Sequence, residues 1–252
     1  MRSTLADDYQ NVPRPVAVMA KDFPSGVTTG RHGHPRAQFL YATAGLMVAT
    51  AEDGTWAVPA GHALLIPPGV MHEVAMHGAV SMRTAYLAPE ALATVPPACR
   101  VLRVSPLLDA ALVALTGEPI LYDLAGRGGH LAALVLDEID RAPDTPFALP
   151  LPQDPRLRRL CRALIDDPGL DGGIDAWADE VGVSRRTLTR RFREETGLSF
   201  GAWRRRVRLL EALTRRARGA AMQEVTATVG YRSPRAFQAM MQRTLGTLAQ
   251  DS

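Results

Sequence analysis

The sequence predicts a two-domain α+β protein: an N-terminal antiparallel β-barrel with trailing helices, then a C-terminal all-α domain of two helix-turn-helix units. Short apolar runs separated by Gly and Pro fill the chain to about residue 88, a proline-rich segment follows later, and the remainder has an apolar pattern of helical period. We therefore place the barrel at 1–95, a helical segment at 96–141, a linker at 142–155 and the helix-turn-helix domain at 156–252.

The barrel is predicted from four strand-sized runs. Each run ends at a cluster of Gly, Pro or Asp, which favours a turn. Runs that recur about every ten residues are typical of antiparallel sandwiches and barrels. The predicted strands are residues 38–42, 46–50, 55–58 and 63–66, with turns at Gly45 and at residues 53–54, 59–61 and 67–69.

Two amphipathic helices are predicted after the barrel. Ser105 and Pro106 open the first, as an N-cap and a first helical residue, and Gly128 and Gly129 precede the second. Apolar stripes of helical period pack either on their own domain or on a second copy of the chain, so this segment is also our candidate for a homodimer interface. The stripes are Leu107, Leu108, Ala111, Leu112 and Leu115, then Leu131, Leu134, Val135 and Ile139.

The linker is predicted from its prolines, which make up five of the fifteen residues from Arg141 to Pro155. Proline has no backbone N–H and a fixed φ, so we expect a semi-rigid extended segment that belongs to neither a helix nor a sheet.

Composition narrows the class of protein. Hydrophobic residues make up 46% and charged residues 22% of the chain, as in ordinary globular proteins. The N-terminus lacks the apolar core of a signal peptide and no run is long enough to cross a bilayer, so we expect a cytoplasmic protein without a membrane segment. Cys99 and Cys161 belong to no paired motif, and we expect reduced thiols.

Charge is distributed unevenly along the chain. Residues 154–252 hold 19 arginines and 12 acidic residues, whereas residues 1–153 hold 10 basic and 14 acidic residues. Lys21 is the only lysine, so nearly all of the positive charge is guanidinium, which suits bidentate contacts with phosphate and with guanine edges. A basic half joined to an acidic half indicates a polyanion partner.

An internal repeat is the most informative feature of the basic half. Each copy has a small residue, a glycine four positions later, and a serine followed by an apolar stripe. A small residue suits a crossing of two helices, glycine suits the turn between them, and serine caps the second helix. Two helix-turn-helix units predict a domain that binds double-stranded operator DNA. The repeated positions are Ala178, Gly182 and Ser184, then Thr226, Gly230 and Ser233.

The two recognition helices differ in charge. In the first, Leu188 and Phe192 mark the inward side, and the outward side has four arginines with no carboxylate before Glu194. A solvated face normally mixes both signs, so this face predicts DNA contact. The second helix has fewer cations, and we expect phosphate contacts and looser base readout from it. The predicted DNA contacts are Ser184, Arg185, Arg186, Thr189, Arg190 and Arg193 in the first unit and Arg235, Gln238 and Gln242 in the second.

The order of these residues resembles the AraC/XylS family of bacterial transcription regulators over residues 155–246. The resemblance implies that the first recognition helix supplies most base contacts, here through Arg186, Thr189 and Arg190. Ala239 stands where some relatives have arginine, and the chain lacks the usual aromatic and proline residues near its end, so we expect weaker binding by the second unit. The matching residues include Trp177, Ala178, Gly182, Ser184, Leu188, Arg190, Phe192, Gly197, Trp203, Arg208, Gly230, Ser233 and Phe237.

Two spacings in the N-terminal half resemble the two cupin motifs, in Gly26–Gly45 and Gly61–His72. The resemblance implies a jelly-roll barrel with metal ligands at His32, His34, Gln38 and His72. Glutamate is usual in place of Gln38, and Met76 stands in place of the final asparagine. Strand alternation puts His32 and His34 on one face, and neutral imidazoles suit Zn, Fe, Ni or Cu.

A hydrogen-bonded polar pocket for an organic effector is the alternative to a metal site. Tyr41, Met47 and Trp56 lie on predicted strands and are candidates for lining such a pocket, although core packing accounts for them equally well.

We expect a ligand- or metal-responsive, sequence-specific transcription regulator that acts as a homodimer and is not an enzyme. The alternative is a metal-dependent dioxygenase or isomerase fused to a DNA-binding domain, for which Glu73 is the nearest acid or base. A third hypothesis is a DNA binder without sequence preference.

Overall fold

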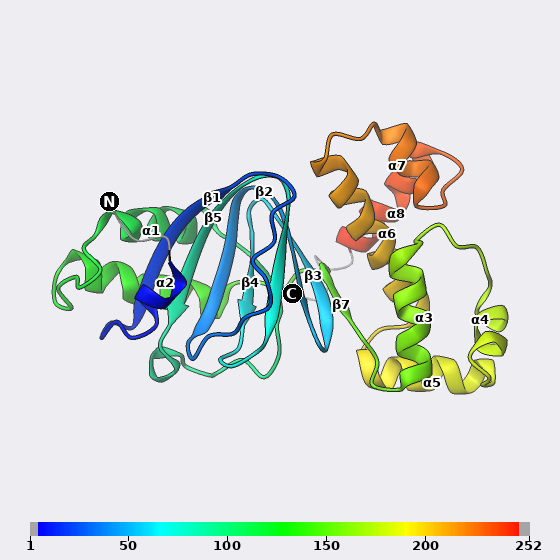
Figure 1. Cartoon of the computed structure of the whole chain (residues 1–252), viewed down its shortest axis with the longest axis horizontal. Coiled ribbons are helices and arrows are strands. Elements are labelled where there is room, and N and C mark those ends of the chain that lie inside the picture. Colours follow the sequence, from blue (N-terminus) through cyan, green and yellow to red (C-terminus); the bar gives the residue numbers. More distant parts are fainter. Residues whose placement is uncertain (1–4, 247–252) are drawn as a thin grey trace. The chain divides into compact units, whose positions relative to one another are not determined.

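The computed structural model describes residues 5–246, with side chains described to residue 244. The chain forms two compact units (Figure 1). The first consists of residues up to 51 together with 56–145, and the second of 52–55 together with the chain from 146 onward. The division after residue 145 lies inside the segment predicted as a linker.

The first unit is built on an antiparallel sheet, which confirms the predicted class of the N-terminal domain. Strands β1 and β2 pair on either side of β5, β4 pairs with both β2 and β6, and all four of these pairs are antiparallel. Short 3-10 helices at Ala6–Tyr9 and Pro89–Ala91 flank the strands. The strands are β1 (Val16–Phe23), β2 (Ala37–Ala51), β3 (Gly54–Pro59), β4 (His62–Ile66), β5 (His72–Leu87) and β6 (Arg100–Arg103).

β2 continues through Gly45, where the sequence predicts a turn. The pairing of β2 with β5 shifts register on both sides of Ala44, so the glycine lies in a β-bulge rather than at the end of a strand. Gly45 has a φ of +78°, and a Cβ atom there would lie 2.4 Å from the carbonyl oxygen of Ala79. The predicted turn was therefore wrong: glycine is needed at this position for a bulge inside one long strand.

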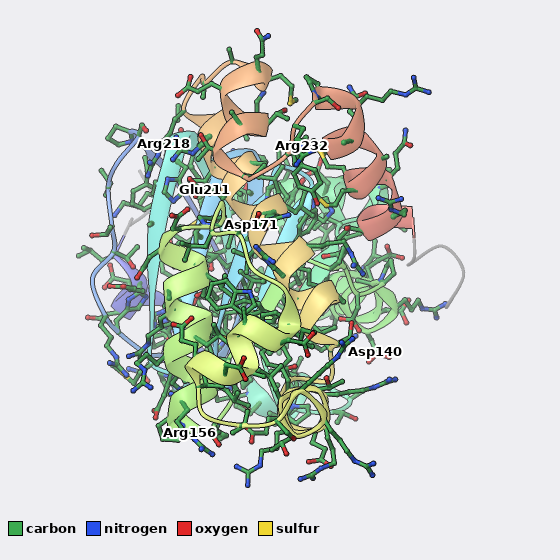
Figure 2. The ribbon with its side chains drawn as sticks, turned by 90° about the vertical axis from the view of Figure 1, so that its right-hand side faces the viewer. Asp140, Arg156, Asp171, Glu211, Arg218 and Arg232 are labelled. Atoms are coloured by element: carbon green, nitrogen blue, oxygen red, sulfur yellow. The ribbon has the colours of Figure 1, made fainter. Side chains whose placement is uncertain are left out.

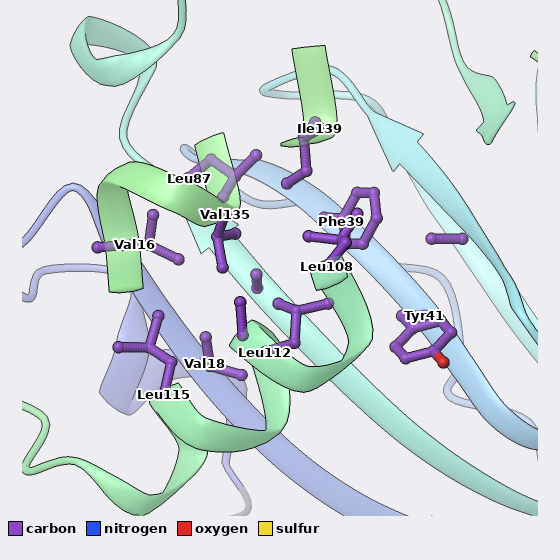
Figure 3. Packing of buried hydrophobic residues seen from close by; sticks show 14 of the residues in the cluster. Val16, Val18, Phe39, Tyr41, Leu87, Leu108, Leu112, Leu115, Val135 and Ile139 are labelled. Carbon is purple, nitrogen blue, oxygen red and sulfur yellow. The ribbon is translucent and has the colours of Figure 1, made fainter. Parts of the chain in front are cut away.

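Helices α1 (Pro106–Gly117) and α2 (Arg127–Arg141) cover one face of this sheet (Figures 1 and 3). The predicted N-cap is confirmed, because the Ser105 hydroxyl accepts the N–H of Leu108 at 3.0 Å. Two details of the prediction were wrong. Leu107 is 51% exposed, and α2 starts before Gly128, whose missing side chain leaves room for the Tyr122 ring. The labelled core residues are Val16, Val18, Phe39, Tyr41, Leu87, Leu108, Leu112, Leu115, Val135 and Ile139.

The second unit is helical and holds two helix-turn-helix pairs, as predicted. One core surrounds Trp203 and Phe192, and a smaller one surrounds Phe237 and Met240. Helix α6 runs between the pairs α4–α5 and α7–α8 (Figure 1). The helices are α3 (Pro155–Asp166), α4 (Ile174–Glu180), α5 (Arg185–Thr196), α6 (Phe200–Ala217), α7 (Met222–Thr228) and α8 (Pro234–Gly246).

Two short strands lie in segments predicted to contain none. β6 falls in the segment expected to be helical, and β7 (Ala148–Pro150) falls in the expected linker, next to β3 in the strand order. Leu149 and Leu151 are buried in the core of the second unit, and the Trp203 indole donates to the carbonyl of Pro150 at 2.8 Å. A short strand at the end of the strand order tolerates proline, so the proline count alone misidentified this segment.

None of the helices within residues 5–246 is both long and apolar enough to span a membrane.

Candidate nucleic-acid interface and metal centre

The first helix-turn-helix is formed by α4 and α5. Gly182 makes the turn with a φ of +70°, and the Ser184 hydroxyl accepts the N–H of Thr187 at 3.2 Å, which confirms the predicted cap. Leu188 and Phe192 on the inner side of α5 are fully buried. Because these two residues hold the inner side against the core, the opposite side of α5 faces solvent.

The outward side of α5 presents the residues predicted to contact DNA. Ser184 and Thr189 are exposed, and so are the four arginines, which lie with Glu194 on one open surface. Arg186 and Arg193 form no ion pair with any residue in the described part of the chain. Their guanidinium groups are therefore available to an anionic partner. The four arginines are Arg185, Arg186, Arg190 and Arg193.

The other two arginines of this surface have carboxylate partners. Both oxygens of Glu194 accept hydrogen bonds from Arg190, at 2.8 and 2.9 Å, and Arg185 lies 3.2 Å from an oxygen of Asp175. The sequence analysis placed Glu194 beyond the arginine face, but its side chain reaches back by one turn. All four side chains are more than half exposed, and exposed ion pairs contribute roughly 0–1 kcal/mol. A phosphate or base edge can replace such a partner.

The second helix-turn-helix has the same construction with less charge. Gly230 makes its turn, and the Ser233 hydroxyl accepts the N–H of Ala236 at 3.2 Å. The predicted contact residues Arg235, Gln238 and Gln242 are exposed on α8. Residues 247–252, where the proline and aromatic residue of the family pattern are missing, lie outside the described residues. In Figure 2, Arg156 lies towards one end of the helical unit and Arg218 and Arg232 towards the other.

Three histidines come together in the first unit. His32 and His34 precede β2, and His72 begins β5. The backbones of His32 and His72 exchange two hydrogen bonds, of 2.9 and 2.8 Å, which hold the two segments side by side. The ring centroids are 4.5 to 5.7 Å apart, and one potential ligand nitrogen from each ring lies within 4.8 Å of the others.

Hydrogen bonds orient two of the rings so that one nitrogen of each is free to bind a metal. Nδ1 of His32 donates to the carbonyl of Gly30, and Nδ1 of His72 donates to that of Val70, both at 2.9 Å. A neutral ring that donates from Nδ1 keeps its lone pair on Nε2, and a carbonyl partner of this kind is typical behind a metal-binding histidine.

Burial keeps two of the three histidines neutral. Desolvation, reinforced by the neighbouring rings of His32 and His72, lowers the pKa of His34 to about 4, and desolvation also lowers the pKa of His72. Both rings are therefore uncharged at neutral pH, which is the form that binds a metal.

Gln38 is connected to the cluster through Tyr86 and has an unpaired acceptor atom within the described residues. Its Nε2 donates to the hydroxyl of Thr84 at 3.2 Å, whereas its Oε1 is buried without a hydrogen-bond partner in residues 5–246. Gln38 is opposite Tyr86 in the β2–β5 register, and the Tyr86 ring lies edge-on to His34 with centroids 5.0 Å apart. Buried polar atoms are rarely left unpaired, so such an atom calls for a partner.

Sequence reasoning missed three residues around this cluster, namely Tyr86, Thr84 and Tyr9. The Tyr9 ring stacks on that of Tyr86 with centroids 6.2 Å apart, and burial raises the pKa of Tyr86 above its usual range. The even-numbered, inward pattern of β5 was a usable signal for Thr84 and Tyr86. No local pattern marks Tyr9, because its position depends on how the N-terminal segment folds back onto the sheet.

The structure places Tyr41 in a core that does not include Met47 or Trp56, the other two predicted effector-pocket residues. Tyr41 packs on the helix-covered face of the sheet, where its hydroxyl donates to Asp109 at 2.9 Å. Met47 is fully buried opposite Met76 of β5, and Trp56 is buried in β3. Tyr41 lies on the opposite face of β2 from Gln38, because it comes three positions later along a regular stretch of strand.

Known proteins resemble both halves of the chain. A family model described as an AraC-like ligand binding domain matches residues 17–168, and one described as a helix-turn-helix domain matches residues 177–251. The transcriptional regulator NimR of Escherichia coli is 30% identical over 220 residues, which cover 87% of this chain and 80% of that protein. The regulator RipA of Corynebacterium glutamicum is 35% identical over 92 residues, covering 36% of this chain and 27% of that protein.

Similarity to solved structures is weaker. Apo ToxT from Vibrio cholerae aligns over 94% of this chain and 96% of its own, at 10% identity and a TM-score of 0.40. A cupin superfamily protein from Desulfitobacterium hafniense covers 29% of this chain and 68% of its own, at 19% identity and a TM-score of 0.28.

The ligand-binding model matches more than half of the chain, and the similarity to NimR extends through both units. The chain therefore belongs to the AraC family of transcriptional regulators.

Proposed function

We propose that this regulator senses a divalent transition metal through His32, His34, His72 and Gln38. One observation carries the proposal: Nε2 of His34, Nε2 of His72 and Oε1 of Gln38 are buried polar atoms without a hydrogen-bond partner in the described chain. Each is an electron-pair donor, and leaving several such atoms unpaired costs free energy unless something binds them.

The chemistry of the donor set fits a metal. Imidazole nitrogens suit Zn, Fe, Ni and Cu, and one nitrogen of each ring lies within 4.8 Å of the others. All four donors are neutral, so they would not offset the positive charge of the bound ion. Such a charge would attract an anionic ligand to the positions that the protein leaves open.

The outward residues of α5 and α8 are the proposed reading surface for operator DNA. Arg186, Thr189 and Arg190 would make the base contacts, and Arg193 with the polar residues of α8 would add phosphate contacts. We further infer a cytoplasmic protein without enzymatic activity. Glu73, the nearest candidate acid or base, is exposed and follows His72 directly in β5, so its side chain points away from the histidines.

A homodimer is proposed through the first unit. Leu107 and Val113 of α1 are about half exposed, and Leu121 and Leu124 in the loop before α2 are more exposed still. Four large apolar side chains exposed within one helix and the following loop support an interface with a second copy. Leu107→Asp with Val113→Asp should give a monomer by sedimentation velocity, and a dimer that persists in this variant would contradict the assignment.

The metal proposal is tested by purifying the protein and measuring uptake of zinc and nickel by calorimetry and elemental analysis. His32→Ala with His72→Ala should abolish uptake, whereas His62→Ala, a histidine outside the cluster, should leave it unchanged. A wild-type protein that binds neither metal nor iron nor copper would refute the proposal. An organic effector in the same polar pocket would then be the remaining hypothesis, to be sought by thermal-shift screening.

A further inference from the structure

The loop between α3 and α4 is held against helix α6 by two arginines. Arg204 donates to the backbone carbonyls of Leu170 and Gly172, the latter at 2.9 Å. Arg208, one turn later in α6, donates from Nε to the carbonyl of Pro168 at 3.2 Å. Three carbonyls of one short loop thus accept charge-assisted hydrogen bonds from α6, and these bonds fix the path of the loop along that helix.

The same loop contacts the second helix-turn-helix directly. A Cβ atom on Gly169 would lie only 2.7 Å from the carbonyl oxygen of Thr228, the last residue of α7. In the opposite direction, a Cβ atom on Gly230 would lie 3.2 Å from the carbonyl oxygen of Gly169. Glycine at both positions therefore allows the backbone of the loop and that of the α7–α8 turn to approach without an intervening side chain.

Arg208 takes part in this contact as well. Its guanidinium lies over the ring of Tyr231, with 5.1 Å between the guanidinium carbon and the ring centroid. Tyr231 lies edge-on to Phe237, a buried residue of the smaller helical core, with ring centroids 5.7 Å apart. Because the guanidinium is planar, it stacks on an aromatic ring while its edge donates hydrogen bonds. Arg208 thus bridges the α3–α4 loop and the second helix-turn-helix.

These contacts give the two helix-turn-helix pairs a second connection besides α6. Helix α6 packs on α5 of the first pair and on α7 and α8 of the second. The α3–α4 loop leads directly into α4, which packs on α5. Two pairs that share only one helix can tilt about it. A further contact through a separate segment of chain limits that tilt.

We propose that Arg208 and the backbone contact at Gly169 fix the distance between the two recognition helices, and with it the spacing of DNA half-sites that the protein accepts. The inference rests on the proposed contact of both α5 and α8 with DNA. One inserted base pair moves a half-site by about 3.4 Å and rotates it by about 35°, since the duplex repeats every 34–36 Å or 10–10.5 base pairs. A rigid pair of helices cannot follow this change. Arg208 and Gly169 are positioning residues in this scheme and make no contact with DNA.

The first test measures how strictly the protein selects the spacing. Fluorescence anisotropy is measured on a duplex that the protein has selected from a random pool, after footprinting has located the two contacted half-sites. The same duplex with one base pair inserted or removed between the half-sites is then compared. In the wild type we expect each change to weaken binding by about tenfold or more, because the contacts of one helix are lost. Arg208→Ala should reduce this penalty to about threefold or less, because the second pair can then tilt to follow its half-site.

Two glycines of the loop provide a matched pair of variants. Gly169→Ala places a methyl group against the carbonyl of Thr228 and should relax the spacing preference or shift it to another spacing. Gly173→Ala should keep the wild-type preference, because no atom lies within 4 Å of its Cβ position. A wild-type spacing penalty in both Arg208→Ala and Gly169→Ala would overturn the proposal. An equal change in Gly173→Ala would overturn it too.

A distance measurement without DNA separates this inference from the proposed reading surface. Spin labels are attached through Thr189→Cys on α5 and Gln238→Cys on α8, in a background that carries Cys99→Ser. Cys161 is fully buried, so it does not react with the label. Pulsed electron resonance then reports the distribution of distances between the two recognition helices.

The distribution should be narrow in the labelled protein and broader when Arg208→Ala is added, whereas Gly173→Ala should leave it unchanged. A distribution that Arg208→Ala does not alter would refute the connection, even if both helices bind DNA. Conversely, a narrow distribution in a protein that accepts every spacing would refute DNA contact by both helices and leave the connection intact.

Discussion

The ion pair between Arg190 and Glu194 makes a prediction that distinguishes base reading from general attraction to DNA. If Arg190 contacts a base edge, Arg190→Ala should cost about 1–3 kcal/mol on a duplex that the protein has selected from a random pool, which is roughly 5- to 150-fold in affinity. Both partners of the pair are more than half exposed, so separating them costs at most about 1 kcal/mol. The DNA contact should therefore prevail over Glu194 in the complex.

The same geometry predicts that Glu194→Gln tightens binding by about two- to fivefold, because the competing carboxylate is lost. A double-mutant cycle by anisotropy separates this effect from a general change in charge. The gain should shrink markedly in the Arg190→Ala background, and Arg159→Ala, an exposed arginine in α3, serves as the control for loss of a cation. An equal loss for Arg190→Ala on all duplexes would mean that Arg190 contacts only phosphate. A gain for Glu194→Gln that does not depend on Arg190 would refute the competition.

Three further predictions concern the metal site and the two folded units. Gln38→Glu should bind zinc at least about tenfold more tightly by calorimetry, because a carboxylate offsets the charge of the ion; weaker binding would place Gln38 outside the ligand set. Gly45→Ala should destabilise the first unit by about 2 kcal/mol or more in urea unfolding, and by more than Gly61→Ala, whose φ is equally positive but whose side-chain space is open. Trp203→Phe should lower the stability of the second unit by about 1–2 kcal/mol through loss of the indole hydrogen bond to β7, and an unchanged unfolding midpoint would contradict that role.

The helical half was largely predictable because its signals are local. Ser184 caps α5 within one turn, and the spacing of Leu188 and Phe192 alone predicts which side of α5 is buried. The two turns are marked by Gly182 and Gly230, both of which have positive φ. Such features depend on neighbours within four residues, so the sequence contains the needed information.

The sheet half was less predictable because pairing joins residues far apart in the chain. His32 and His34 were linked to His72 only through a family resemblance. The alternation of β5 predicts that Tyr86 points inward, but its place beside the histidines depends on the register of β5 against β2. The bulge at Gly45 was not predicted for the same reason, because it too depends on strand pairing. A glycine between two apolar runs favours a turn or a bulge equally, and the partner strand decides which forms.

Strand β7 shows what amino-acid composition alone does not predict. Prolines at positions 146, 150 and 152 indicate an extended chain, which is correct, but they say nothing about what the chain packs against. Leu149 and Leu151, which alternate with the prolines, are buried beside Trp203. The alternation of proline with leucine was the signal for an extended segment with one buried face.

The number of arginines in the second unit overstates the positive charge that is available to DNA. Arg204 and Arg206 on α6 both donate to backbone carbonyls, and burial lowers the pKa of each. They tie α6 to the α3–α4 loop and to β7, whereas Arg186 donates to no carbonyl within the described part of the chain. Arg206→Ala should therefore lower stability by about 1–3 kcal/mol and leave the salt dependence of DNA binding unchanged.

Arg186→Ala should leave stability nearly unchanged and weaken binding to the selected duplex by about 1–3 kcal/mol, because Arg186 is a proposed base contact. Each phosphate contact contributes about 0.9 to the slope of log affinity against log salt concentration, so a slope flattened by nearly one, with an equal loss on every duplex, would mean that Arg186 contacts phosphate instead. A flattened slope in Arg206→Ala with stability retained would mean that this guanidinium leaves the carbonyl of β7 to reach DNA, and that the separation between structural and DNA-facing arginines is wrong.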